Sequence, residues 1–417
     1  MALKTWCSLV RQRAIENAFV VHSGLALFMA WGFVQALFRR RRSAVRVLSQ
    51  VHRTTRLSWM RRLVEPYLIA NRKAIYSEPQ LLSEPDLISF LGNRLMVLKP
   101  PAPGGEKGVL FAMVSVMFRL LHSNMNLDRL LNDYTLVFEP SWSGYCHPDL
   151  IEYTRWKEEI FILSAEENDF AFLKKLGSNL VPVDLGPCDW VDPRTAAPYL
   201  NSPKEFDIVM NSNWAAWKRH FVLFQMLRNA HRRYKVALIG VKWGGRTQDD
   251  IMRLADYYGV TDQLTIFDWI PYEQVMDLTC KSQVSILLSL KEGSNRAIAE
   301  SIFCNVPVVI LSNHVGGIRK NVVPETGLLA EEAHLEAAIA TLLKSNIQPR
   351  EWGLEHVSCF KSTEKLNSIL RRHALAQGRP WAQDIAVRSN SPESSYVDPG
   401  DAERLSPWNE GLKDYLR

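Results

Sequence analysis

Two glutamates and a short polar turn lie together in the segment 287–311, LLSLKEGSNRAIAESIFCNVPVVIL. Glu292 stands where an apolar strand ends, and Glu300 lies about two turns into the helix expected after the turn. At 1.5 Å per residue, Glu300 is roughly 8 Å from the helix start, comparable to the reach of a sugar diphosphate. One carboxylate could therefore bind hydroxyls at one end of a nucleotide sugar, and the other could bind hydroxyls at the opposite end. The backbone N–H groups of Gly293–Asn295 would then face the phosphates between them.

The elements around this segment alternate between strands and helices. Strands are expected at 207–211, 235–240, 264–267, 284–290 and 308–311, and helices at 217–232, 248–258, 272–280 and 332–343. Alternating units of this length form a parallel, doubly wound sheet that binds its ligand at the carboxyl ends of the strands. We therefore predict a Rossmann-like, nucleotide-sugar-binding domain over 205–350.

A first Rossmann-like domain is predicted over 74–190, with an acceptor-binding role. Its expected strands are 94–99, 134–138, 160–164 and 180–183, its expected helix is 169–176, and the apolar run 109–118 fits a strand or a helix. The loops 140–144 and 165–169 directly follow strands, so they are candidates for acceptor contact, although ordinary turns have the same composition. A Pro-, Gly- and Asp-rich stretch then crosses to the second domain.

Length and composition favour a globular chain with two domains and extensions, since 417 residues exceed one ordinary core and 23% are charged. The six cysteines, including Cys7, are scattered without a metal-binding or disulfide-like spacing, which favours a reducing compartment. No His-Glu-x-x-His or Asp-x-Asp sequence is present, so we expect neither a metal site nor a cofactor.

Positive charge is concentrated in the N-terminal segment 1–73, which holds fourteen lysines and arginines against two glutamates. The other residues carry 36 basic and 42 acidic side chains of the chain's 50 and 44. Residues 19–38 are apolar enough to span a bilayer, and Arg39–Arg42 would hold that end in the cytoplasm. Residues 44–73 continue as a basic amphipathic pattern, typical of a helix on lipid head groups or one packed on the first domain.

We therefore predict a membrane surface as a partner, and exclude nucleic acid, because the basic charge lies beside an apolar segment. The predicted location is the cytoplasmic face of a membrane, through a single span or an in-plane helix, or the cytoplasm. A buried helix is the alternative for 19–38. At the other end, residues 351–417 are predicted to form a helix to about Ala376 and then an aromatic, Pro-rich tail that packs back across the domains.

The segment from Glu292 to Glu300, with Pro307-Val308-Val309 beyond it, resembles the E-x7-E signature of retaining family 4 glycosyltransferases with the GT-B fold. The resemblance implies that Glu292 contacts the donor sugar and Glu300 the ribose. It implies that Lys218, with Arg219 beside it, holds the diphosphate. Further donor contacts are expected from the glycine turns around the site, which contain Gly293, Ser294, Asn295, Gly316 and Gly317.

The chain departs from the family pattern at three places. Asn213 stands where an arginine is common, five residues before the lysine, and Gly293-Ser294-Asn295 replaces the usual Gly-Phe-Gly. Asn305 replaces the glycine that ends the helix, and asparagine still tolerates the left-handed conformation required there. The first change bears on phosphate affinity and the others bear on donor fit.

The predicted function is that of a metal-independent glycosyltransferase that moves a sugar, with retention, from a nucleotide sugar to a glycan or lipid-linked acceptor, as in polysaccharide biosynthesis. The catalytic residues would be Glu292 and Lys218, the latter stabilising the departing diphosphate. His147 and His220 are further acid–base candidates or ordinary satisfied histidines. A sugar-nucleotide epimerase of the same fold and a non-catalytic, membrane-associated binding module are the alternatives.

Overall fold

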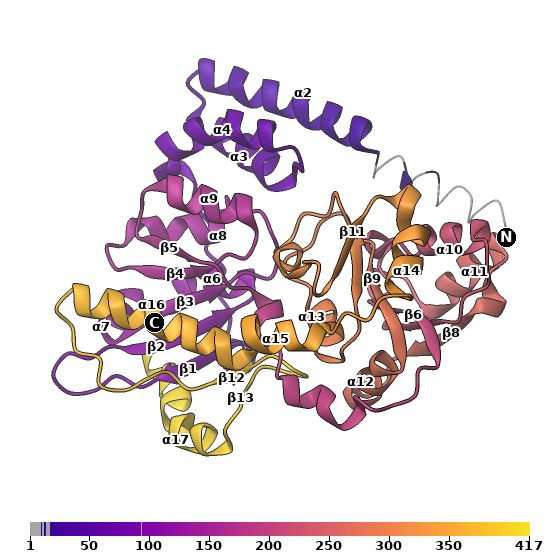
Figure 1. The fold of residues 1–417 in the computed structure, drawn as a ribbon. Coiled ribbons are helices and arrows are strands. Elements are labelled where there is room, and N and C mark those ends of the chain that lie inside the picture. The colour runs from indigo at the N-terminus through magenta and orange to yellow at the C-terminus, as the bar shows by residue number, and fades with distance from the viewer. Residues whose placement is uncertain (1–9, 11, 14–16, 93) are drawn as a thin grey trace. The chain divides into compact units, whose positions relative to one another are not determined.

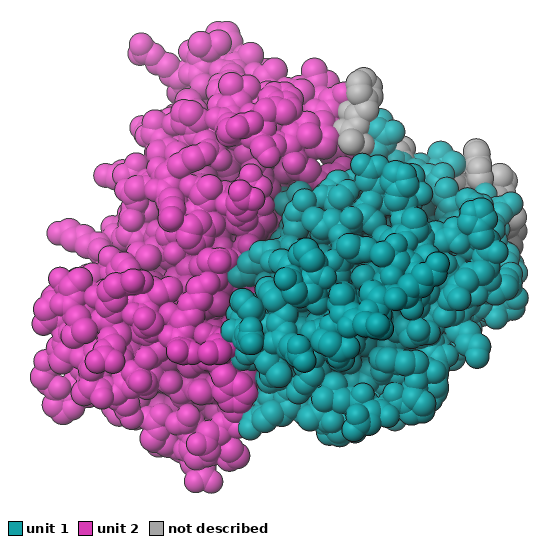
Figure 2. All heavy atoms as spheres, in the orientation of Figure 1, with its two compact units in different colours: residues 1–20, 191–358 teal, residues 21–190, 359–417 magenta. Residues whose placement is uncertain are grey.

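The structure, a computed structural model, describes residues 10, 12–13, 17–92 and 94–417. It divides into two compact units (Figure 2). Unit 1 contains Val191–Ser358 together with the described residues up to Val20, and unit 2 contains Val21–Trp190 and Cys359–Arg417. The first of the two segments of unit 2 ends at Trp190, where the first predicted domain also ends. Unit 2 also includes the N-terminal helices and the C-terminal segment, which the sequence prediction set apart.

Unit 2 is built on a five-stranded sheet of order β1-β2-β3-β4-β5 (Figure 1). Strand β1 is antiparallel to β2, and the other neighbours are parallel. The strands are β1 (Leu95–Lys99), β2 (Gly108–Met113), β3 (Tyr134–Glu139), β4 (Ile160–Leu163) and β5 (Leu180–Val183). The run 109–118, for which the sequence allowed a strand or a helix, contains both, because β2 ends at Met113 and helix α6 begins at Ser115.

Helices cover both faces of this sheet. The face that includes Val97, Leu110 and Phe138 packs against the N-terminal helices and those between the strands. The opposite face, with Leu98 and Phe111, packs against α16 and the residues that follow it. The helices of the first face are α3 (Arg41–Thr54), α4 (Ser58–Ala70), α5 (Glu84–Leu91), α6 (Ser115–Asn124), α7 (Leu127–Asp133), α8 (Pro148–Ile151) and α9 (Glu167–Leu176).

The predicted apolar N-terminal helix is α2 (Ala18–Leu37). It packs on α3 so closely at Gly32 that an added Cβ would meet the Leu48 side chain at 2.6 Å. Its outer face carries Leu27 and Trp31, which are 73% and 54% exposed. Among the described residues, α2 is the one helix long and apolar enough to cross a membrane, over Val20–Leu37.

The predicted C-terminal segment is divided between the units. Helix α15 (Pro349–His356) lies in unit 1, whereas α16 (Cys359–Ala376), the hairpin β12 (Arg388–Ser389) and β13 (Ser395–Tyr396), and α17 (Pro399–Glu410) lie in unit 2. Arg388 fixes the hairpin there. Its fully buried guanidinium lies 4.1 Å from the Phe111 ring centroid and pairs with Glu139 at 3.1 Å.

Unit 1 contains a six-stranded, wholly parallel sheet of order β11-β10-β9-β6-β7-β8. Its strands are β6 (Phe206–Asn211), β7 (Val236–Gly240), β8 (Leu264–Asp268), β9 (Ser282–Leu287), β10 (Val308–Leu311) and β11 (Gly327–Ala330). The chain therefore builds outward from β6 to one edge and then returns to β9 on its other side. The predicted α/β class with two Rossmann-like domains and an N-terminal helical segment is confirmed.

Both faces of the unit 1 sheet are also covered. Helices α10 (His220–Asn229), α11 (Gln248–Tyr258) and α14 (Leu335–Leu342) pack on the face that includes Ile208 and Val284. Helix α12 (Tyr272–Cys280) packs on the other face. Helix α13 (Arg296–Phe303) joins it there, where Ser301 Oγ donates to Ser285 Oγ over 2.9 Å.

Candidate functional site

The central strands of the unit 1 sheet place the site. Strands β6 and β9 are neighbours, and the connections from them run in opposite directions along the sheet. In an open parallel sheet, the carboxyl ends of two such strands border a crevice in which ligands bind. Lys218 follows β6 and Glu292 follows β9, so the topology brings these two predicted residues to the same crevice.

Lys218 and Glu292 form a buried ion pair, with Lys218 Nζ 2.6 Å from Glu292 Oε1. Asn295 donates from Nδ2 to the other carboxylate oxygen of Glu292 over 3.0 Å. Burial by itself would raise the pKa of Glu292, but the Lys218 charge and the hydrogen bonds from Lys218 and Asn295 lower it. Glu292 is therefore ionised and held in one orientation.

The predicted glycine turn at 316–317 lies against the Glu292 loop. The Glu292 N–H donates to Val315 O over 3.0 Å, and the Gly317 N–H donates to Gly293 O over 2.6 Å. An added Cβ on Gly316 would lie only 2.9 Å from Gly293 O and 2.6 Å from His314 Nε2. The residue must therefore be glycine for the two loops to approach this closely.

Asn295 is also the N-cap residue of helix α13. Its Oδ1 accepts the Ile298 N–H over 3.1 Å and caps the helix N-terminus, while its Nδ2 holds Glu292. Ser294 lies half-buried in the turn before it. The asparagine that replaces a family glycine thus fixes the helix start and the catalytic candidate together.

Glu300 is buried on α13 and is bound by two side chains. Tyr272 donates its hydroxyl to Glu300 Oε1 over 3.1 Å, and Arg296 Nε lies 3.0 Å from the same oxygen. Tyr272 begins α12, so the pair also connects two helices on one face of the sheet. The ribose-binding role of Glu300 stays a prediction.

The predicted helix 217–232 is wrong at its start, around Arg219. Residues Ala216–Lys218 form a 3₁₀ turn, Arg219 is left-handed with φ 61°, and α10 begins only at His220. The Arg219 side chain is buried and donates to Glu332 Oε1 over 2.7 Å and to Leu288 O over 3.3 Å. It therefore connects the Lys218 loop to the end of β9, and its predicted donor contact stays a prediction.

Asn213, which stands at the family's arginine position, has a local structural task. Its Oδ1 accepts the Ala215 N–H over 3.2 Å, which stabilises the turn that leads to Lys218. An asparagine can close this turn, whereas the longer guanidinium of an arginine would extend past it. The structure therefore explains the residue at this position through the loop itself.

His314 is the residue of this site that sequence reasoning missed. It is buried, its Nδ1 lies 2.8 Å from Ser289 O, and burial lowers its pKa. The carbonyl requires a hydrogen on Nδ1, so Nε2 is an acceptor, and no described residue satisfies it. A histidine shortly before Gly316-Gly317 was the available signal, but one histidine alone does not indicate a site.

The two histidines considered from the sequence lie elsewhere. His220 is fully buried beside Trp214, with Nε2 3.3 Å from Ser212 Oγ, and burial followed by the charges of Arg246 and Lys218 lowers its pKa to about 3. This is the environment of a core histidine. His147 belongs to unit 2 and begins α8.

The two loops predicted to contact an acceptor are brought together in unit 2. Asp169 accepts the backbone N–H groups of Gly144 and Tyr145 over 2.7 and 3.0 Å, and Glu166 caps the start of α9. Their carboxylates are therefore used to hold the two loops in place. Trp142, which is 48% exposed, remains at the surface of the first loop.

Potential metal ligands do not gather in the part of the chain that the structure describes, where no three His, Cys, Asp or Glu side chains form a candidate metal site. The described cysteines are buried thiols, namely Cys146, Cys188, Cys280, Cys304 and Cys359. Cys7 lies outside the described residues, as do other parts of the predicted segment 1–73.

Comparisons with known proteins identify the domain that carries this site. Residues 193–355 match the model of the family described as glycosyl transferases group 1, which confirms the resemblance to glycosyltransferases, while the retaining family 4 subtype stays a prediction. No curated protein matches the chain. The ion pair of Lys218 and Glu292 lies inside the matched residues.

Several solved glycosyltransferase structures are similar in fold. Sucrose-phosphate synthase from Thermosynechococcus elongatus is 18% identical with a TM-score of 0.47, over 64% of this chain and 74% of that one. The lipopolysaccharide outer core galactosyltransferase WaaB is 11% identical with a TM-score of 0.47, over 76% and 82%. Anabaena HepE in complex with UDP and glucose is 13% identical with a TM-score of 0.45, over 59% and 74%.

Proposed function

We propose that this protein transfers a sugar from a nucleotide donor to a glycan or a lipid-linked acceptor, with retention of configuration and without a bound metal ion. The observation that carries the proposal is the buried Lys218–Glu292 pair, oriented by Asn295 at the crevice between β6 and β9. The family match supplies the reaction class, and the pair supplies the groups for binding a sugar and a diphosphate.

The donor diphosphate binds over Lys218 and the N–H groups of the 293–295 turn. An ammonium carries three hydrogens, so Lys218 can donate to a phosphate oxygen while it also pairs with Glu292. As the bond between the sugar and the diphosphate breaks, negative charge grows on the departing oxygen. A fixed cation and oriented N–H groups stabilise this charge in the place of a metal ion.

Glu292 accepts hydroxyls of the donor sugar, and Glu300 accepts those of the ribose. The acceptor hydroxyl attacks the anomeric carbon from the face that the diphosphate leaves, so configuration is retained. One carbon–oxygen bond forms and one breaks, and the acceptor proton passes to the departing diphosphate. No protein nucleophile is required in this scheme.

The protein acts at the cytoplasmic face of a membrane, where its nucleotide donor is available and where α2 contacts lipid. The outward apolar side chains of α2, such as Leu27 and Phe28, and the arginines that follow this helix support this location. An acceptor held at the same surface would be a lipid-linked sugar or a growing glycan.

Nucleotide binding and transfer test the proposal separately. The purified full chain should be stabilised against heat by one of UDP, GDP or ADP, and should transfer sugar from the matching donor with an unchanged rate in EDTA. Glu292→Gln and Lys218→Met should each lower kcat by about 100-fold or more, because each removes a charge that acts on the transition state. Glu300→Gln should mainly weaken nucleotide binding.

Matched controls are Glu325→Gln and Lys344→Met, which change exposed residues of the same unit and should retain the wild-type rate. The anomeric configuration of the product, read by NMR, tests retention. Conversion of a nucleotide sugar without any acceptor would replace the proposal with an epimerase. The absence of stabilisation by all three nucleotides would replace it with a non-catalytic module.

A further inference from the structure

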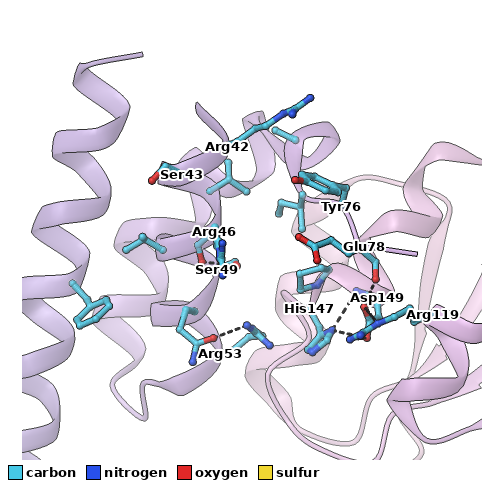
Figure 3. Close-up of a pocket in the computed structure, with 18 residues that line it drawn as sticks. Arg42, Ser43, Arg46, Ser49, Arg53, Tyr76, Glu78, Arg119, His147 and Asp149 are labelled. Atoms are coloured by element: carbon cyan, nitrogen blue, oxygen red, sulfur yellow. Dashed lines mark hydrogen bonds and ion pairs between the residues drawn. The ribbon is translucent and has the colours of Figure 1, made fainter. Parts of the chain in front are cut away.

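A cavity lies within unit 2, outside the residues of the proposed sugar-transfer site. It has a volume of about 820 Å³ and lies between α3, the chain after α4 and the start of α8 (Figure 3). Phe28 of α2 also lines it. This volume is within the range of pockets that hold small ligands, which is roughly 300–1,000 Å³. Neither the sugar-transfer site nor the family match includes its residues.

One wall of this cavity is the polar face of α3. Arg42, Arg46 and Arg53 line it at spacings of one and then two helical turns, with Ser49 and Gln50 between the last two. The opposite face of α3 is buried in the core of unit 2 through Leu48 and Val51 among others. Because that face is fixed by packing, the arginines are presented to the cavity by a rigid support.

The other wall adds a fourth arginine and two carboxylates. Arg119 binds Asp149 through two hydrogen bonds of 3.0 and 2.9 Å, and Ser77 also donates to Asp149. Asp149 is therefore already satisfied, and Glu78 is the remaining carboxylate of the lining. With four arginines against two carboxylates, the cavity has a positive balance.

Two of these arginines have no carboxylate partner. Neither Arg42 nor Arg46 forms an ion pair with any residue that the structure describes, and Arg42 lies over the Tyr76 ring at 5.6 Å. Arg53 comes from the same helix and points toward His147 of the opposite wall (Figure 3). An anion that entered the cavity would therefore meet the Arg42 and Arg46 guanidinium groups, which no described carboxylate neutralises.

His147 adds a neutral donor. Its Nδ1 accepts the Asp149 N–H over 3.2 Å, so the hydrogen of the neutral ring is on Nε2. Burial, followed by the neighbouring charge of Arg53, lowers its pKa to about 4, which keeps the ring neutral at physiological pH. The cavity thus combines arginine forks with a ring N–H donor, which is a set suited to phosphate oxygens.

The surroundings of the cavity are apolar. Phe28 and Tyr76 line it and are 57% and 43% exposed. Phe28 belongs to α2, whose outward residues form the apolar surface described above. A soluble anion would not use this surface, whereas a phosphate attached to a hydrocarbon chain would use both the arginines and the apolar helix.

We propose that this cavity binds the phosphate or diphosphate group of a single-chain lipid, whose hydrocarbon chain lies along α2. The charged group is held by Arg46 and Arg53 together with the Nε2–H of His147. Resting on the proposed function, this lipid is the carrier of the acceptor sugar. The cavity then explains why the basic segment belongs to the same compact unit as the first Rossmann-like domain.

Direct binding to the full chain in detergent tests this assignment without any transfer reaction. The probes are farnesyl diphosphate, farnesol, inorganic diphosphate and vesicles of phosphatidylglycerol. Farnesyl diphosphate should bind at least about tenfold more tightly than farnesol or inorganic diphosphate, because only it engages both surfaces. Phosphatidylglycerol should compete weakly, because its head group is held at a bilayer surface together with two acyl chains, which the proposed single-chain site along α2 does not accommodate.

Variants locate the site. Arg46→Gln and Arg53→Gln should each weaken farnesyl diphosphate binding about tenfold, while Arg62→Gln, an exposed arginine of α4 outside the cavity, should not change it. Arg46 is exposed, so its substitution leaves the core intact, and a melting curve of each variant checks this. None of the three should alter stabilisation by nucleotide.

The outcomes separate this inference from the proposed function. Equal affinity for farnesol and farnesyl diphosphate, or no effect of the arginine variants, would overturn the phosphate site even if sugar transfer proceeds normally. Phosphatidylglycerol binding as tight as that of farnesyl diphosphate would replace the carrier site with an anchor for membrane lipid. Lys218→Met should abolish nucleotide stabilisation and leave farnesyl diphosphate binding unchanged.

Discussion

At the scale of single residues, the site depends on a buried pair whose members need each other. Removing one partner of such a pair leaves a charge that is neither hydrated nor neutralised, which usually costs more than the pair itself contributes. Lys218 and Glu292 are 8% and 6% exposed, so this asymmetry applies to both. Asn295 adds a hydrogen bond to the same carboxylate and thereby couples the pair to the start of α13.

A double-mutant cycle tests this coupling. Lys218→Met should lower the opening free energy of α13 amides by about 3 kcal/mol, because Glu292 is left buried and charged. The double variant Lys218→Met/Glu292→Gln should lose less than the sum of the two single variants, by about 1–3 kcal/mol. Native-state hydrogen exchange measures these values, and strict additivity would contradict the coupling.

At the scale of elements, α3, which forms one wall of the basic cavity, is held in place by side-chain contacts that join it to α4 and α9. Glu65 of α4 accepts from His52 of α3 over 3.4 Å and from Lys175 of α9 over 2.8 Å. The hydrogen bond from His52, opposed by burial and reinforced by Lys175, lowers the pKa of Glu65 to about 2. One carboxylate thus connects three helices of unit 2.

This connection should make unit 2 sensitive to acid. Because the folded-state pKa of Glu65 is about 2 and its ordinary value is 4.5, its stabilisation is complete above about pH 4.5 and is lost as the pH falls toward 2. Glu65→Gln should lower the free energy of unfolding near neutral pH by about 1–2 kcal/mol. It should also make the free energy of unfolding fall less steeply as the pH decreases from about 4.5 to 2. Urea unfolding between pH 2 and 7 measures it, and parallel curves for the two proteins would disprove the linkage.

At the scale of the whole molecule, the chain joins a unit that matches a glycosyltransferase family model to a unit with an apolar outward helix. The family match covers residues 193–355, whereas α2 and the arginine face of α3 belong to unit 2. The C-terminal segment returns to unit 2, where Arg388 is buried between aromatic rings and paired with Glu139. The proposed membrane contact and the proposed sugar transfer thus belong to different units of one chain.

Substitutions on α2 test the membrane contact. Leu27→Glu combined with Trp31→Glu should lower the fraction of protein that sediments with anionic vesicles by about tenfold, because two apolar side chains that would enter the lipid become charged. Leu81→Glu is the matched control, since Leu81 is 76% exposed in the same unit but lies outside α2. Unchanged sedimentation of the double variant would assign membrane contact elsewhere.

The sequence by itself determined the elements whose pattern is local. The strand, turn and helix around Glu292, most strands of the two sheets and the apolar helix α2 follow from periodicity over a few residues. Asn305 also fulfilled its local requirement, because it ends α13 with φ 58°, in the left-handed region that asparagine tolerates. Lys218 was selected by the family resemblance, and the structure places it beside Glu292.

Only the tertiary structure decided which distant side chains meet. No local pattern predicts the left-handed Arg219, the buried His314 or the buried Arg388. Each is fixed by partners tens to hundreds of residues away in the chain. The basic cavity is a stronger case, since its walls come from α3 and from three later parts of the chain, at 74–78, 119 and 147–149. Periodicity shows which face of an element is buried, but the topology of the sheets and the packing of helices determine what that face contacts.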